Sequence, residues 1–208
     1  PGQIYNSNFY TLAALLRALG IEPIDGGRVP DSLPETEEAL RRLAQQADCI
    51  ITSGGVSAGE EDHVRAALQR CGKLTLWKLA LKPGKPFAFG RIDHTLLFGL
   101  PGNPVSAFVT FLLLVRPALL AMMGASGDSL PGRWERAGFT LPRSGERQAY
   151  LRVCLQSADE EPLLQLLPDQ SSGVLSSVAY ADGLAVIPAF TSVAVGDRLR
   201  FLAFGDIV

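Results

Sequence analysis

The segment that decides the fold is Cys49-Ile50-Ile51-Thr52-Ser53-Gly54-Gly55-Val56-Ser57-Ala58-Gly59-Glu60-Glu61-Asp62. A short apolar run breaks into a loop rich in glycine and serine, and three acidic residues follow just before a helical pattern. This order predicts a strand, a loop and a helix start, the place where α/β proteins bind phosphate-bearing ligands. A tight turn with no ligand is the alternative that this segment leaves open.

The loop is suited to an oxyanion. Its glycines permit backbone conformations closed to other residues, and its hydroxyl groups and free amides supply donors. The candidate binding residues are Ser53, Gly54, Gly55, Ser57 and Gly59. The acids beside them would repel an anion unless a divalent cation lies between them or one acid caps the next helix. Asp62 fits the cap position because a helical stripe begins after it.

A second strand and loop follow the same plan. Residues 95–100 read as a buried strand that runs into Pro101-Gly102-Asn103-Pro104, and Val105–Met123 reads as a long apolar helix. The two prolines fix the turn, so its amides and the Asn103 side chain would be held in place before a ligand arrives. In a parallel sheet both loops would emerge at the same edge.

Three lysines, at 78, 82 and 85, lie in an otherwise apolar segment between these loops. Lys78 and Lys82 are an even number of residues apart, so an extended strand would point both to one face. Such a pair suits an oxyanion. The alternative is a solvated edge strand, although Lys82-Pro83-Gly84-Lys85-Pro86 is built as a stiff turn.

Four segments in order resemble the molybdopterin molybdenumtransferase family, which includes gephyrin's E domain. They are Gly2–Asn8, Ser53–Ser57 with Gly59 and Asp62, Trp77-Lys78 with Lys82–Pro86, and Leu100–Ser106. The resemblance covers most of the chain. Family members carry about as much chain again before the first segment, so this sequence resembles their C-terminal half. The resemblance implies a homodimer in the full-length protein, with the other half closing the active site.

The resemblance also implies a reaction. The family inserts molybdenum from molybdate into adenylylated molybdopterin and releases AMP, in a step that needs a divalent ion such as Mg²⁺. The reactants are all negative, so the site needs lysines, backbone amides and a cation held by carboxylates. By this resemblance the catalytic residues are Asp31, Asp62, Lys78 and Lys82, and both aspartates hold the metal. The remaining substrate-binding residues are Asn8, Pro101, Gly102, Asn103, Pro104, Arg152 and Ser172.

Plainer roles stay open for several of these residues. Asp31 has the setting of a turn or cap residue, whereas capping and metal binding are compatible for Asp62. Arg152 lies in a predicted strand whose solvent-facing side is not fixed by sequence, and Ser172 lies in an ordinary turn composition. His63 and His94 lack the spacing of a metal site and are predicted to be surface residues.

Composition limits the partners. The 19 basic and 21 acidic residues give a net charge of −2 without a basic run, which argues against nucleic acid and anionic membranes. The uninterrupted apolar stretch Ala107–Val115 is too short to span a bilayer, which needs about 20 residues. Three unclustered cysteines indicate buried thiols in a reducing compartment, and we expect a cytoplasmic protein.

The pattern predicts two domains. Residues 1–126 are expected to form an α/β domain with a doubly wound, mostly parallel sheet. Its first elements are a helix capped by Asn8, a strand at Ile21–Ile24 and a helix at Pro34–Gln46. Residues 132–208 are expected to form a small all-β domain. Its strands are predicted at Tyr150–Leu155, Leu163–Leu167, Leu184–Ile187 and Leu199–Phe204.

The favoured function is therefore the pterin-nucleotide and molybdate site of a molybdenumtransferase. One alternative is a molybdopterin adenylyltransferase, which shares the sheet and the glycine-serine loop but is disfavoured by the Lys82–Pro86 turn and the β domain. The other is a non-catalytic scaffold that binds a peptide, as gephyrin's E domain does.

Overall fold

A computed structural model describes residues 5–56, 63–126, 130–156 and 162–208. The chain divides into two compact units. The N-terminal unit comprises Pro1–Leu79 and Gly84–Phe111, and the C-terminal unit comprises Ala80–Pro83 and Leu112–Val208. The α/β class and the separate β domain predicted from the sequence are confirmed.

A four-stranded sheet forms the centre of the N-terminal unit, in the order β1 (Cys49–Ser53), β5 (Thr95–Leu100), β4 (Ala88–Ile92), β2 (Lys73–Trp77). β1 and β5 are parallel, whereas β4 is antiparallel to both of its neighbours. The sheet is therefore mixed, and only the β1–β5 pair has the parallel arrangement expected from the sequence. The reason is the two-residue turn at 93–94, because so short a connection can join only antiparallel strands.

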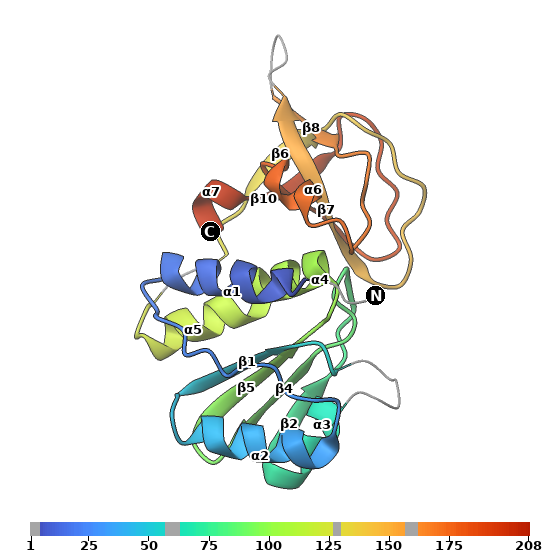
Figure 1. Ribbon diagram of the computed structural model, residues 1–208. Coiled ribbons are helices and arrows are strands. Elements are labelled where there is room, and N and C mark those ends of the chain that lie inside the picture. The colour runs from blue at the N-terminus through green and yellow to red at the C-terminus, as the bar shows by residue number, and fades with distance from the viewer. Residues whose placement is uncertain (1–4, 57–62, 127–129, 157–161) are drawn as a thin grey trace. The chain divides into compact units, whose positions relative to one another are not determined.

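Helices cover both faces of this sheet (Figure 1). On one face, α2 (Leu33–Ala44) and α3 (His63–Cys71) pack against each other and the strands. On the other, α1 (Ser7–Ala18) packs on α4 (Pro104–Thr110), which contacts β5. The fully buried Leu68 and Leu97 join α3 to the sheet in one apolar cluster. Layers of this kind bury the apolar stripe of each helix.

Two expectations for the first elements were wrong. Residues 21–24 form no strand, since Pro23 has no N–H to pair and Ile24 is 59% exposed. The cap of α1 is Asn6, whose Oδ1 accepts a hydrogen bond from the Phe9 amide at 3.2 Å. Asn8 lies inside the first turn and is buried.

The lysine segment is not one extended strand. β2 ends at Trp77, and Lys78 has a φ of +69°, which is outside the extended conformation of a strand. Lys82 belongs to β3 (Leu81–Lys82), which pairs with a strand of the C-terminal unit. Lys78 and Lys82 therefore do not belong to one extended strand, and their even spacing does not place them on a common face.

A continuous helix runs over Pro104–Met122, through α4, a π-helical turn at Phe111–Val115 and α5 (Arg116–Met122). The π turn precedes Pro117, which lacks the N–H of a regular helix. By length and composition this helix could cross a membrane, so the expectation that Arg116-Pro117 makes it too short was wrong. However, 61% of its most apolar 18-residue window is buried within the protein, as in the core helix of a soluble protein.

In the C-terminal unit β6 to β10 pair in a closed ring, β7–β8–β6–β10–β9–β7, and β3 pairs with β7 outside the ring. Their bounds are β6 (Arg133–Ala137), β7 (Gln148–Gln156), β8 (Leu163–Leu166), β9 (Gly183–Ile187) and β10 (Arg198–Ala203). Two short helices, α6 (Ser176–Ala179) and α7 (Phe204–Ile207), accompany them. Val153, Leu164, Ala185, Ile187 and Phe201 fill the interior. The four predicted strands are confirmed, whereas β6 escaped prediction because its sequence Arg-Trp-Glu-Arg is mostly polar and exposed.

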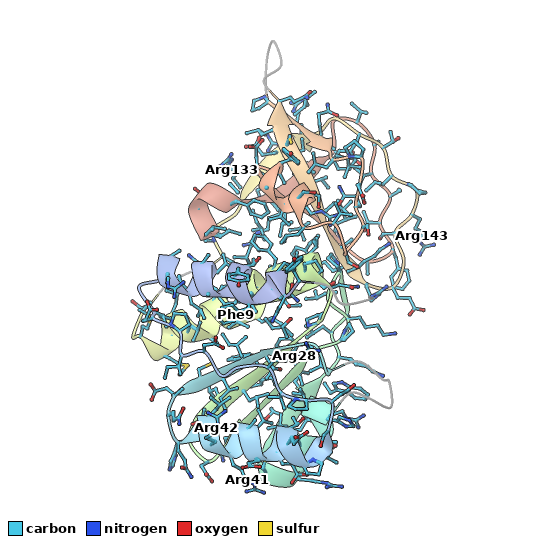
Figure 2. The ribbon with its side chains drawn as sticks, in the orientation of Figure 1. Phe9, Arg28, Arg41, Arg42, Arg133 and Arg143 are labelled. Atoms are coloured by element: carbon cyan, nitrogen blue, oxygen red, sulfur yellow. The ribbon has the colours of Figure 1, made fainter. Side chains whose placement is uncertain are left out.

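Exposed arginines occur in both units, and the thiols are less buried than the sequence predicted. The exposed Arg41 and Arg42 lie together on α2, whereas Arg133 and Arg143 lie at opposite sides of the C-terminal unit (Figure 2). The three cysteines are free and only partly buried. Burial, with a smaller effect of the Asp48 charge, raises the pKa of the Cys49 thiol to about 12.

Candidate functional site

The loops that follow β1 and β5 meet at one edge of the sheet, as the sequence predicted. The Gly54 amide donates a hydrogen bond to the Leu100 carbonyl at 2.9 Å. A Cβ built on Gly102 would lie 3.8 Å from the Gly54 Cα. The parallel pairing of β1 with β5 places both loops at the carboxyl ends of their strands.

Asn8 ties the two loops together. Its Nδ2 donates to the Ser53 Oγ at 2.6 Å and to the Gly102 carbonyl at 2.8 Å. The Ser53 hydroxyl in turn donates to the Pro101 carbonyl at 3.3 Å. Asn8 is 8% exposed, so its amide serves to organise the two loops rather than to face solvent. Sequence reasoning named Asn8 as a binding residue and as a cap, and neither role describes this cross-link.

The first loop requires its glycines. Gly54 has a φ of +89° and Gly55 a φ of +70°, both in the region that strains other residues. A Cβ on Gly55 would also lie 2.8 Å from a methyl group of Val64. The Val64 amide donates to the Gly55 carbonyl at 3.1 Å and so ties α3 to the loop.

The second loop begins α4. Pro104 is the first residue of that helix, and the Ala107 amide donates to the Asn103 carbonyl at 2.9 Å. Pro101 is buried, whereas Gly102 and Asn103 are exposed. The proline-bounded turn expected from the sequence therefore presents its two central residues to solvent.

Asp31 lies beside the start of α3. Its Oδ1 is 3.7 Å from the Nε2 of His63, whose side chain is 25% exposed. His63, predicted to be a surface residue, is therefore partly exposed and lies close to the Asp31 carboxylate. Ser57, Gly59 and Asp62 lie outside the described residues. Within the described ranges, no group of three or more histidine, cysteine and acidic side chains could hold a metal.

The Lys78 ammonium group lies over the ring of Trp77. Its Nζ lies 4.1 Å from the centre of the Trp77 ring, and the Arg65 guanidinium carbon lies 3.6 Å from it. The Trp77 Nε1 donates to the Val56 carbonyl at 3.2 Å, next to the glycine loop. Sequence reasoning quoted Trp77 only as part of the Trp77-Lys78 segment and gave it no role, and it did not name Arg65, which follows Asp62 by three residues.

The other predicted residues belong to the C-terminal unit. Lys82 is exposed on β3. Arg152 in β7 is fully buried, which rules out the solvated-surface alternative, and burial lowers the pKa of its guanidinium. Its Nη2 donates to the Asp169 and Ser171 carbonyls, both at 3.0 Å. These bonds hold the turn that carries the half-buried Ser172.

Comparison with known proteins places this arrangement in a family. The model of the "Probable molybdopterin binding domain" family matches residues 1–121, which is more than half of the chain. The chain belongs to the molybdopterin-binding domain family. A second model, the "MoeA C-terminal region (domain IV)", matches residues 136–204 and therefore covers the β domain.

Curated relatives of this chain are longer. It is 50% identical over 123 residues to the molybdopterin molybdenumtransferase of Haemophilus influenzae, covering 59% of this chain and 30% of that protein. It is 37% identical over 209 residues to molybdopterin molybdenumtransferase 2 of Mycobacterium tuberculosis H37Rv, covering 96% of this chain and 51% of that protein. Dictyostelium discoideum gephyrin is 36% identical to it over 222 residues, covering 90% of this chain and 31% of gephyrin. The chain thus spans about half the length of these relatives or less.

A solved structure shares the fold of this chain. The molybdopterin biosynthesis MoeA protein of Pyrococcus horikoshii superposes with a TM-score of 0.80 at 29% identity, covering 98% of this chain and 49% of that one. Together with the match over residues 136–204, this likeness counts against the adenylyltransferase alternative.

Proposed function

We propose that this chain carries the substrate site of a molybdopterin molybdenumtransferase. In the complete enzyme, molybdate would be inserted into adenylylated molybdopterin with release of AMP. The observation that carries the proposal is the pair of loops after β1 and β5, cross-linked by Asn8 within a chain of this family. A rigid, amide-rich edge of this kind binds oxyanions without reorganisation.

A cation beside the first loop supports the same assignment. Lys78 is an exposed cation beside the first loop, and lysine is a strong partner for phosphate. In the C-terminal unit, Lys82 supplies a further exposed cation, and Arg152 orders the turn that bears Ser172. We propose that Lys78, Lys82 and Ser172 contact the anionic substrates, whereas Arg152 holds the turn.

Mg²⁺ is part of the proposal. Magnesium keeps several waters and needs only one or two carboxylates together with substrate phosphates. Asp31 fits this use because its carboxylate is 63% exposed and its described ionic partner is a histidine rather than an arginine or lysine. Asp62 is proposed as the second carboxylate from the sequence alone. When bound, the ion would neutralise charge on the phosphates of the pterin nucleotide.

The surroundings of the reaction are also proposed. We propose a homodimer for the full-length protein and a cytoplasmic location, which agrees with three free cysteines. The peptide-binding scaffold is the remaining alternative, supported by the likeness to gephyrin.

The test separates binding from catalysis. Adenylylated molybdopterin is titrated into this chain, and AMP release is then measured with the chain alone and with the uncovered half of a full-length relative added. We expect binding by the chain alone and AMP release only from the mixture, because an open site leaves charged reactants hydrated and poorly oriented. Absence of binding at any accessible concentration contradicts the proposed function.

A further inference from the structure

Arg65 and Lys78 share one aromatic ring beside the glycine loop. The two cations lie 3.6 and 4.1 Å from the centre of the Trp77 ring, well inside the range of a cation–π contact. They come from different elements, Arg65 from α3 and Lys78 from the residue after β2. Two like charges brought to one ring repel each other, so the arrangement suits a site that receives an anion between or beside them.

The ring is a fixed platform. The Trp77 Nε1 donates to the Val56 carbonyl at 3.2 Å, one residue after the glycine pair of the first loop. Val64, the neighbour of Arg65, donates its amide to the Gly55 carbonyl at 3.1 Å. Both elements that carry the cations are therefore tied by hydrogen bonds to the same loop.

Arg65 differs from the other arginine of the same helix. Arg70 forms an ion pair with Glu37 at 3.0 Å. For Arg65, the described parts of the chain provide the Trp77 ring but no hydrogen-bond acceptor for its buried Nε. The planar guanidinium presents several N–H donors that match the oxygens of a phosphate-like anion, and contact with a ring leaves these donors to other partners.

Lys78 shows a second sign of functional constraint. Its φ of +69° is uncommon for a residue other than glycine, asparagine or aspartate. The Lys78 amide donates to the Phe87 carbonyl at 3.0 Å, and this bond helps to hold the conformation. Backbone strain of this kind gathers at binding sites, where the surroundings keep a side chain in a required place.

We propose that Arg65 is a further oxyanion-binding residue of this site, acting with Lys78, and that Trp77 is the residue that positions both. The ligand is a tetrahedral oxyanion, either the phosphate of a nucleotide or molybdate itself. This inference rests on the proposed function for the location of the substrate site, and it adds to that site a residue on α3 and its aromatic support.

The experiment titrates AMP and, separately, molybdate into the 208-residue chain by calorimetry at two ionic strengths. Arg65→Ala should weaken binding of at least one of the two anions about tenfold or more, and should reduce the salt dependence of that binding. The anion that loses affinity identifies the source of the oxyanion. Arg70→Ala, a charge removal on the same helix, is the matched control and should bind both anions as the wild type does.

Three further variants test the roles of the guanidinium group and of the aromatic ring. Arg65→Lys retains the charge without the planar fork and should recover only part of the lost affinity. Trp77→Leu should weaken binding although no charge is removed, whereas Trp77→Phe, which retains a ring, should lose less. Circular dichroism spectra matching the wild type establish that each variant is folded.

The outcomes separate this inference from the proposed function. If the wild type binds and Arg65→Ala binds equally well, Arg65 has no part in the site, and the proposed function stands without it. The same result for Trp77→Leu removes the positioning role. If the wild type binds neither anion, both the inference and the oxyanion site on which it rests are overturned.

Discussion

Replacing Asn8 by alanine should loosen the two loops and weaken the site that they form. The change removes the donors of two hydrogen bonds, to the Ser53 Oγ at 2.6 Å and to the Gly102 carbonyl at 2.8 Å. Each such bond contributes about 1 kcal/mol net, so the free energy of unfolding should fall by about 2 kcal/mol. Ligand affinity should fall as well, because the loops would have to be ordered on binding.

The assay follows the N-terminal unit alone. The chain has two tryptophans, and replacing the exposed Trp134 by phenylalanine leaves Trp77 as the fluorescent reporter during urea unfolding. Asn6→Ala is the matched control from the same helix end, because it removes one exposed cap bond to the Phe9 amide and should cost about 1 kcal/mol. It should leave ligand affinity unchanged. Equal stability losses in the two variants, with wild-type affinity in Asn8→Ala, would refute the cross-link argument.

Three other outcomes are expected. Gly55→Ala should lower the free energy of unfolding by about 1 to 2 kcal/mol, because the residue has a φ of +70° and its new methyl group would meet Val64 of α3. Gly102→Ala is the control and should change this free energy by less than about 0.5 kcal/mol, as measured by urea titration of both variants. Cys49, with a pKa of about 12, should resist iodoacetamide at pH 8 and react about tenfold faster per pH unit up to pH 11; rapid labelling of the native protein at pH 8, followed by mass spectrometry, would contradict this. Asp31→Asn in the complete enzyme should shift the Mg²⁺ dependence of AMP release to higher concentrations, measured beside Asp25→Asn from the same loop, and identical Mg²⁺ curves for the wild type and Asp31→Asn would exclude Asp31 as a ligand.

The local parts of the fold were predictable because their signals lie close together in the chain. The apolar runs at 49–53 and 95–100, each ended by a rigid polar loop, specify β1 and β5 and the loops that follow them. The strand predicted at Ile21–Ile24 from its isoleucines does not form, because Pro23 has no N–H to pair with a neighbouring strand. The prediction of a mostly parallel sheet was wrong for β4. Its two-residue connection to β5 permits only an antiparallel pair, whereas the alternation of strands and helices along the chain suggested parallel strands.

The site was predictable in its residue types but not in its contacts. Ser53, Gly54, Gly55 and Gly102 could be named from composition and turn chemistry. The donation from Asn8 to two loops depends on residues 45 and 94 positions away, which no local pattern contains. Arg152 was ambiguous for the same reason, because its burial depends on carbonyl groups of a distant turn.

The short strand β3 limits where the chain can be truncated or recombined. The chain leaves the N-terminal unit at Ala80, returns at Gly84 and leaves again at Leu112. Because β3 pairs with β7 at Gln148 and Ala149, a shortened chain that ends before β7 would keep an unpaired strand, and a β domain expressed from residue 112 onward would lack one. During translation, β3 leaves the ribosome long before its partner is made. Recombination between relatives should therefore keep both units from the same parent. A chimera joined within the helix Pro104–Met122 would need residues 80–83 from the same parent as its β domain.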